Sequence, residues 1–184
     1  MPLFPSLTEE SGVLSCLVHF RRDVAGPLIE LHERILRGQS VLTPLQRELI
    51  GAFVSAVNRC DYSTAIRISV ARGLGANDQL CEQLLSPLAD NVDELNIEPE
   101  MKPLLWYVRK LTLRPETLQR ADVEAVLSAG WDEQVLMDTV LVCCLYNFMD
   151  RLSSGIGLTK PETINPSNLE VLVRRGYRSI LDDL

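Results

Sequence analysis

The stretch "TPLQRELIGAFVSAVNR", residues 43–59, carries the strongest structural signal in the chain. Thr43 stands before Pro44, and Gln46 follows three residues after the threonine, which is the order of a helix start with a capping box. Apolar residues then recur at helical spacing over a wide stripe: Leu45, Leu49, Ala52, Phe53, Ala56 and Val57. We therefore predict a helix here that buries most of one side, with Glu48 beside the apolar stripe.

Seven further segments combine helical periodicity with residues that start or stop helices. They are residues 26–37, 62–72, 77–85, 103–113, 120–129, 132–152 and 167–175. The segment before residue 25 has weaker periodicity and is left unassigned, although its apolar residues could dock on a core. Alternation of apolar and polar residues, as in a strand, does not recur, and neither do hairpin turns. The sequence thus predicts an all-α bundle of about eight helices.

The length and composition of the chain suit one helical domain. A chain of 184 residues can bury a full core without disulfides, and 46% hydrophobic but only 5% aromatic residues favour aliphatic helix packing. A polar link, "ADNVDELNIEPE" at residues 89–100, separates one group of helices at about 26–75 from a second at about 100–175. We expect both groups to belong to a single domain over residues 1–184.

Charge and cysteine usage exclude several classes of protein. A net charge of -7 without a basic stripe argues against a nucleic-acid partner. The opening "MPLFPSLTEESG" lacks the features of an export signal, and the most apolar stretch, residues 135–149, is too short and too interrupted to span a membrane. Five irregularly spaced cysteines and two histidines form neither a disulfide framework nor a zinc pattern. We expect a cytoplasmic protein without a metal or cofactor.

Two long stretches carry recognisable short motifs. Residues 31–63, "LHERILRGQSVLTPLQRELIGAFVSAVNRCDYS", hold a Gly-x-Ser link, an Arg-Glu pair and an Asn-x-Cys-x-Tyr turn. Residues 104–158 hold Lys-Leu-Thr, an Ala-Gly-Trp turn and an Asn-Phe-x-Asp-Arg helix end. In this order the motifs resemble the AhpD-like alkylhydroperoxidases and carboxymuconolactone decarboxylases, and in particular their peroxidase-related branch. The resemblance covers most of the chain and implies an AhpD-like helical bundle.

The resemblance also implies a redox motif, in which a glutamate is followed after eleven residues by Cys-x-x-Cys and, three residues later, by histidine. Glu48 and Cys60 have the required spacing in this chain. The second cysteine of the motif, however, falls on Ser63, and the histidine falls on Arg67. Glu48 and Cys60 are therefore the candidate catalytic residues, and two positions of the motif are degenerate.

These two replacements change the chemistry that the resemblance implies. In the family, the second cysteine attacks a hydroperoxide as a thiolate, the first forms a disulfide with it, and the glutamate and histidine move protons. A serine hydroxyl cannot enter a sulfenic acid to disulfide cycle, and an arginine stays protonated. We therefore expect ordinary peroxidase turnover to be absent. Because an isolated buried charge is costly, we also predict a salt bridge between Glu48 and Arg67.

Three functions remain open from the sequence. One is residual antioxidant activity on a small hydroperoxide at Cys60, with an external thiol or the distant Cys81 completing the cycle. Another is a redox-silent site that binds a small acidic or apolar ligand, in which Ser63 and Arg67 would present donors to a carboxylate or phosphate. The third is acid–base catalysis of the decarboxylase type, for which Glu48 lacks a second tunable group. The resemblance further implies a homo-oligomer, either a dimer or a larger assembly.

The other candidate residues are interpreted as structural. His19 and His32 precede the motif, and we expect His32 on the surface of a helix. Cys143 and Cys144 lie in the most apolar predicted helix and are expected in the core. A polar group near the end of that helix is interpreted as a cap and a subunit contact: Asn147, Asp150 and Arg151. Aromatic residues that could line a pocket, but more often belong to a core, are Tyr62, Trp106 and Tyr107.

Overall fold

The computed structural model describes residues 2–8, 11–162, 164 and 166–182. Over these residues the chain forms nine α-helices and three short 3₁₀ helices, without a strand, so the all-α prediction is confirmed. The α-helices are α1 Val13–Arg37, α2 Pro44–Val57, α3 Asp61–Gly73, α4 Asp78–Leu84, α5 Met101–Leu113, α6 Arg120–Ser128, α7 Glu133–Gly155, α8 Pro166–Arg175 and α9 Ser179–Asp182. The 3₁₀ helices are η1 Pro87–Asp90, η2 Val92–Glu94 and η3 Pro115–Thr117.

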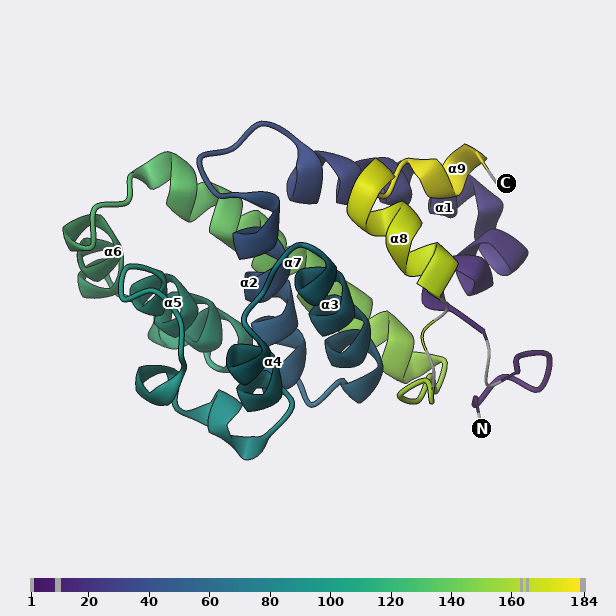
Figure 1. Cartoon of the computed structure of the whole chain (residues 1–184), viewed down its shortest axis with the longest axis horizontal. Coiled ribbons are helices and arrows are strands. Elements are labelled where there is room, and N and C mark those ends of the chain that lie inside the picture. The colour runs from purple at the N-terminus through teal and green to yellow at the C-terminus, as the bar shows by residue number, and fades with distance from the viewer. Residues whose placement is uncertain (1, 9–10, 163, 165, 183–184) are drawn as a thin grey trace.

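Helix α2 is the central element of the fold. It begins with the predicted capping box, in which Gln46 N donates to Thr43 Oγ1 at 3.2 Å and Thr43 N donates to Gln46 Oε1 at 2.9 Å. Every residue from Arg47 to Val57 is buried. Helix α7 crosses the middle of the molecule beside α2, while α5 and α6 lie at one end (Figure 1). At the other end α9 packs against α1, and α8 packs against α3 and α9.

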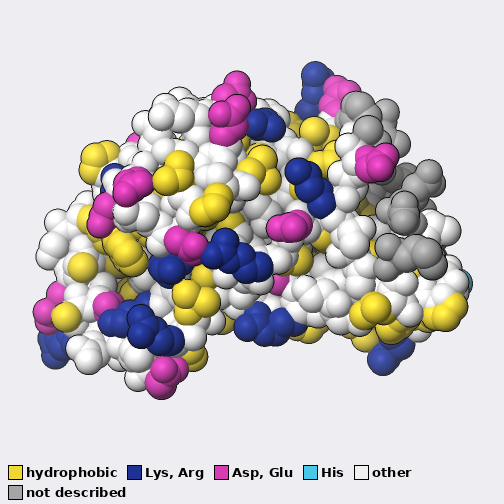
Figure 2. Space-filling view, turned by 90° about the horizontal axis from the view of Figure 1, so that it is seen from below, with side chains coloured by type: hydrophobic (Ala, Val, Ile, Leu, Met, Phe, Trp, Pro, Cys, Tyr) yellow, Lys and Arg dark blue, Asp and Glu magenta, His cyan; other side chains and the backbone are white. Residues whose placement is uncertain are grey.

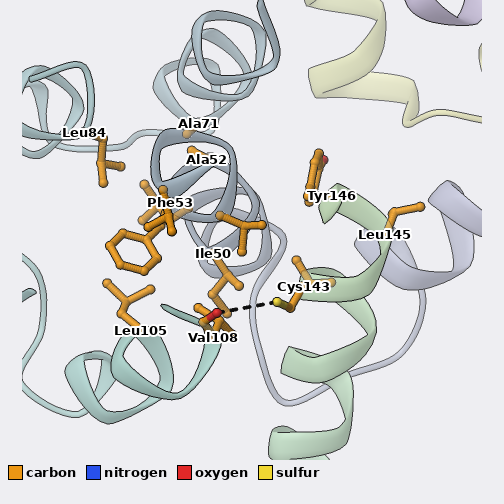
Figure 3. Packing of buried hydrophobic residues seen from close by; sticks show 14 of the residues in the cluster. Ile50, Ala52, Phe53, Ala71, Leu84, Leu105, Val108, Cys143, Leu145 and Tyr146 are labelled. Carbon is orange, nitrogen blue, oxygen red and sulfur yellow. Dashed lines mark hydrogen bonds between the residues drawn. The ribbon is translucent and has the colours of Figure 1, made fainter. Parts of the chain in front are cut away.

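One hydrophobic cluster, which extends along the chain from Val13 to Tyr177, fills the space around α2. In this cluster the Cys143 thiol of α7 points at the carbonyl oxygen of Val108 in α5, 3.8 Å away (Figure 3). Burial raises the pKa of Cys143 to about 11, as expected for a core cysteine. Cys144, by contrast, is exposed, so its predicted core position is wrong. Neighbouring residues on a helix point about 100° apart, and only the first of the two faces α5.

Helix α1 begins at Val13 and not near residue 26. It consists of two helical pieces joined at Arg21, whose backbone angles (φ -146°, ψ 63°) are not helical. Val13 and Cys16 of the first piece are buried against the core. A break of this kind changes the direction in which successive residues point, which explains the weak periodicity of the segment before residue 25.

The polar link at residues 89–100 is folded against the core. It contains η2 and the end of η1, and three of its apolar side chains are buried: Ala89, Val92 and Leu95. Helix α9, which the sequence did not predict, follows Tyr177 and is only four residues long. Among the described residues, no helix combines the length and the apolar character needed to cross a bilayer.

The surface carries charges of both signs. On the face shown in Figure 2, lysine and arginine side chains lie among aspartates, glutamates and hydrophobic residues, and no cationic stripe crosses this face. Several cations pair locally with carboxylates, for example Arg59 with Asp90 and Lys110 with Asp122. This mixed face lacks the clustered cations that displace counterions from nucleic-acid phosphates.

Candidate functional site

Glu48 lies at the centre of a buried ionic cluster. Its side chain is 0% exposed, and its Oε2 atom is 3.4 Å from Nη1 of Arg67 on α3. The predicted pair is thus present, but the shorter bond, at 2.8 Å, joins Oε1 to Nη2 of Arg37 at the end of α1. One carboxylate therefore neutralises two guanidinium groups only in part, and these three residues together carry one excess positive charge.

Two tyrosines complete the shell around the carboxylate. Tyr177 donates its hydroxyl proton to Glu48 Oε1 at 2.7 Å, and Tyr146 of α7 donates to Oε2 at 3.5 Å. Arg67 Nη1 in turn donates to both hydroxyl oxygens. The guanidinium carbons of Arg37 and Arg67 lie 5.1 Å and 5.4 Å from the centre of the Tyr177 ring, within the range of cation–π attraction.

The backbone at Gly176 places Tyr177 in this cluster. Gly176 has a positive φ of 73°, a conformation that residues with a Cβ atom rarely adopt. The turn brings the backbone N–H groups of Tyr177 and Arg178 to Oε2 of Glu33 on α1, at 2.7 Å and 3.2 Å. The Tyr177 side chain can then reach inward to Glu48.

Arg47, the neighbour of Glu48, holds the junction between α1 and α2. Its Nη1 atom donates to the carbonyl oxygens of Ile35 and Gly38, at 3.0 Å and 2.9 Å, and so binds the C-terminal end of α1. A cation is favourable at that end of a helix, where carbonyl groups lack partners. This junction brings Arg37, at the last position of α1, to Glu48.

The electrostatics of the cluster keep its arginines charged and its tyrosines neutral. Burial disfavours the charge on Arg67, but Tyr146, Tyr177 and Glu48 outweigh it and raise the pKa of the guanidinium. Burial likewise raises the pKa values of the Tyr146 and Tyr177 hydroxyls, so both remain proton donors. The cluster is therefore a fixed set of donors around one carboxylate.

Cys60 lies apart from the ionic cluster and is buried, with 5% of the residue exposed. Its thiol is 3.3 Å from Oγ of Ser63 and 3.9 Å from the carbonyl oxygen of Asp150. Although Cys60 is the N-cap residue of α3, burial raises its pKa and outweighs the lowering by Ser63. All five cysteines are free thiols, and Cys81, the proposed distant partner, is fully buried in α4.

The polar group near the end of α7 joins two helices instead of capping one. Asp150 is buried and accepts hydrogen bonds from Ser55 Oγ and Asn58 Nδ2 of α2 and its C-cap, both at 2.8 Å. Asn147 accepts from Asn58 at 3.2 Å and from Arg151 at 2.7 Å. The predicted capping role is wrong because α7 continues to Gly155, and the predicted subunit contact stays untested.

A cavity of about 400 Å³ borders the ionic cluster. It lies between α1, α3, α7 and the segment that carries α8 and Tyr177. Its lining includes the two degenerate motif positions, Ser63 and Arg67, but not Glu48 or Cys60. Apolar side chains form much of the remaining wall: Val13, Leu14, Ile66, Met149, Val171, Leu172 and Ile180. The arrangement offers a small apolar chamber with a cation at one wall.

His32 also lines this cavity, so the prediction of a surface position is wrong. The residue is 2% exposed, and its Nδ1 atom is 2.8 Å from the carbonyl oxygen of Leu28. Burial lowers the pKa of His32 to about 4, which keeps the imidazole neutral at physiological pH. The sequence did contain a signal for this buried position. Leu28, His32 and Leu36 follow one another at intervals of four residues and therefore share one face of α1.

Of the three aromatic candidates, only Tyr62 lines the cavity. Its hydroxyl accepts a hydrogen bond from the backbone N–H of Val13 at 2.9 Å. Trp106 is 42% exposed and donates to Asp93 at 3.1 Å, while Tyr107 packs at the edge of the core. The described residues contain no group of three or more potential metal ligands.

Comparisons with known proteins agree with this architecture. The sequence matches no family model and no curated protein. A solved structure of an uncharacterized peroxidase-related protein from Silicibacter sp. TM1040 is 24% identical and superimposes with a TM-score of 0.73, covering 80% of this chain and 74% of its own. The AhpD core of an uncharacterized peroxidase-related protein from Ralstonia eutropha JMP134 is 21% identical and has the same TM-score. The match covers 86% of this chain and 78% of that chain. The chain thus has the AhpD-like fold of these peroxidase-related proteins.

Proposed function

We propose that this chain is an AhpD-like, peroxidase-related protein that lacks ordinary thiol peroxidase turnover and binds a small, largely apolar acid in its cavity. The observation that carries the proposal is the replacement of the reactive groups in the cavity wall. The wall presents Ser63 and a charged Arg67 where the family motif has a cysteine and a histidine. A thiol cycle has no nucleophile there, whereas an acid has a cationic partner.

The geometry of Arg67 supports the binding of an acid. Among the described residues, all its hydrogen bonds are donated by Nη1. The Nε and Nη2 atoms thus keep their donor capacity, and the side chain is 11% exposed at the cavity. Because Arg37, Arg67 and Glu48 sum to one positive charge, a monoanionic ligand would neutralise the cluster. Charge-assisted hydrogen bonds of this kind are stronger than neutral ones.

Residual peroxidase activity at Cys60 is the second candidate, and one contact favours it. The Cys60 thiol is 3.3 Å from the Ser63 hydroxyl, and Ser63 lines the cavity, so a hydroperoxide in the cavity would lie near the sulfur. Burial and the raised pKa of Cys60 weigh against this candidate, because the thiolate is the reactive species. Acid–base catalysis by Glu48 has less support, since its carboxylate is fully buried among four donors.

A peroxidase assay tests the loss of the thiol cycle. With cumene hydroperoxide and a dithiol, the purified protein should show no turnover above that of its Cys60→Ser variant. Alkylation at pH 7.5, followed by mass spectrometry, should label the exposed Cys144 well before Cys60, whose raised pKa leaves little thiolate. Robust turnover that disappears in Cys60→Ser would favour the second candidate instead.

Binding of hexanoate tests the acid site. Titration calorimetry should show that hexanoate binds at least about tenfold more tightly than 1-hexanol, because only the acid pairs with Arg67. An Arg67→Met variant should lose this preference, and it leaves Glu48 with Arg37 as a balanced pair. Arg120→Met, at an arginine whose side chain is 92% exposed, is the matched control and should bind as the wild type does. Equal affinity for the acid and the alcohol would contradict the proposal.

We also propose that the chain associates with copies of itself through α7. Four exposed side chains follow one another along this helix at intervals of four, three and four residues: Met137, Leu141, Cys144 and Phe148. This spacing produces a continuous apolar stripe of the kind that packs against a second helix. The stripe supports a partner of the same chain, because both helices can bury the same residues about a twofold axis.

A charge placed in the stripe tests this association. Leu141→Glu should convert the assembly to monomers, since each copy would bury a carboxylate against apolar side chains. Light scattering coupled to size-exclusion chromatography measures the mass directly. Leu85→Glu, at an equally exposed leucine after α4, is the matched control and should not alter the mass. A wild-type protein that is monomeric at high concentration would disprove the association.

A further inference from the structure

His32 brings to the cavity a hydrogen-bonding atom that the ionic cluster does not use. Its Nδ1 atom is 2.8 Å from the Leu28 carbonyl, and a carbonyl oxygen can only accept. The proton of the neutral ring is therefore on Nδ1, which leaves a lone pair on Nε2. Among the described residues no hydrogen bond reaches Nε2, although His32 is 2% exposed and lines the cavity. Nε2 is not among the fully enclosed side-chain atoms that lack a partner, so it keeps some accessible surface, and an open acceptor on a buried ring points to a ligand that supplies the donor.

This acceptor lies near the cation that we propose binds the acid. The centre of the His32 ring is 5.5 Å from the centre of the Tyr177 ring, and the guanidinium carbon of Arg67 is 5.4 Å from the same point. Both side chains therefore flank Tyr177, whose own hydroxyl is engaged with Glu48. Both residues also line the same cavity, so a small molecule bound there has a donor group of Arg67 and an acceptor of His32 in its walls.

We propose that the cavity takes a small hydroxy acid, whose carboxylate binds Arg67 and whose hydroxyl donates a hydrogen bond to Nε2 of His32. This inference rests on the acid-binding function proposed above and narrows its ligand class. His32 then determines specificity, because a ligand without the hydroxyl leaves Nε2 unpaired on burial. The apolar wall accommodates the hydrocarbon part of the ligand.

Because the tautomer of His32 is fixed, the site favours ligands that donate a hydrogen bond to Nε2 over ligands that can only accept one. Since Nδ1 is held by Leu28, Nε2 cannot donate while the ring is neutral. The pKa of about 4 keeps it neutral over the physiological range. A second carboxylate or a carbonyl oxygen at this position would face a lone pair, so the site should select monocarboxylic hydroxy acids over dicarboxylates and keto acids.

The test compares acids that differ only in the second group. Titration calorimetry with hexanoate, 2-hydroxyhexanoate, 3-hydroxyhexanoate and 2-oxohexanoate should show that at least one hydroxy acid binds about tenfold more tightly than hexanoate, and more tightly than the keto acid. A His32→Phe variant keeps a ring but removes the acceptor. In this variant the hydroxy acid should bind no more tightly than hexanoate. His19→Phe, at the exposed second histidine, is the matched control and should keep the gain.

The outcomes separate this inference from the function on which it rests. If hexanoate binds through Arg67 but no hydroxyl adds affinity, the hydroxy-acid inference is wrong and the acid site remains. If none of the acids binds, both are wrong. Should His32→Phe fail to fold, ¹H–¹⁵N spectra of the two wild-type histidines still decide, because the Nε2 resonance of His32 must shift when the hydroxy acid binds and must not shift with hexanoate.

Discussion

The Glu48→Gln variant should lose about 3–5 kcal/mol of unfolding free energy, as expected when one partner of a buried ion pair is removed. Glutamine preserves the shape of the side chain but leaves Arg37 and Arg67 charged without a counter-ion. Both guanidinium groups are nearly buried, with 11% of each side chain exposed. Urea denaturation followed by circular dichroism measures the loss as a lower transition midpoint.

An exposed glutamate provides the control for this experiment. Glu124 pairs with Arg120 at 3.1 Å one turn away on α6, and its side chain is 61% exposed. Pairs of this kind contribute well under about 1 kcal/mol, so Glu124→Gln should leave the midpoint almost unchanged. The double variant Glu48→Gln/Arg67→Gln should lose less unfolding free energy than the two single variants combined. Each substitution removes a charge that the other would leave without its partner. Equal midpoints for the wild type and Glu48→Gln would contradict the ionic role of the cluster.

The Gly51→Ala variant should lose about 1–3 kcal/mol of unfolding free energy, since added volume in a packed core forces side chains to move. A Cβ atom at Gly51 would overlap the ring carbons of Tyr146, and it would lie only 2.8 Å from Cζ. The ring cannot swing away freely, because its hydroxyl is bonded to Glu48 and Arg67. We expect both a lower melting temperature and weaker binding of hexanoate, as the change reaches the site through Tyr146.

Gly155→Ala is the matched control, because its Cβ atom would meet nothing within 4 Å at the end of α7. Alanine is a better helix former than glycine, so this variant should be neutral or slightly more stable. Differential scanning calorimetry of both variants compares the same chemical change at a filled and at an open position. If the Gly51→Ala and Gly155→Ala variants had the same melting temperature, α2 and α7 would be able to move apart without a cost in stability.

Helix α2 was predictable because its signals are local. The residues that start it, Thr43, Pro44 and Gln46, lie within one turn, and its apolar stripe has a single period. The first half of α1 was not predictable in this way, because Arg21 interrupts the helix and no residue type at that position signals the break. Local sequence signals were thus enough to predict the order of the helices, whereas the break of α1 at Arg21 depends on packing.

The site was predictable only in part for a similar reason. Glu48 and Arg67 could be paired because both occupy motif positions and an isolated buried charge is costly, and His32 could have been recognised from its four-residue spacing. Tyr177 gave no such signal, since it lies 129 residues after Glu48 and reaches it through a glycine turn held by Glu33. Contacts between distant segments have no periodic signature in a sequence.

The position of Tyr177 also sets an order of events during synthesis of the protein. Ribosomes add about 5–20 residues per second, so the tyrosine emerges on the order of ten seconds after the glutamate that it binds. Arg67 follows Glu48 after only 19 residues, so for most of that interval the nascent chain has both arginines and the carboxylate but not the side chain that closes the cluster. Because α7, α8 and Tyr177 all supply lining residues, the complete cavity wall is a late product of translation.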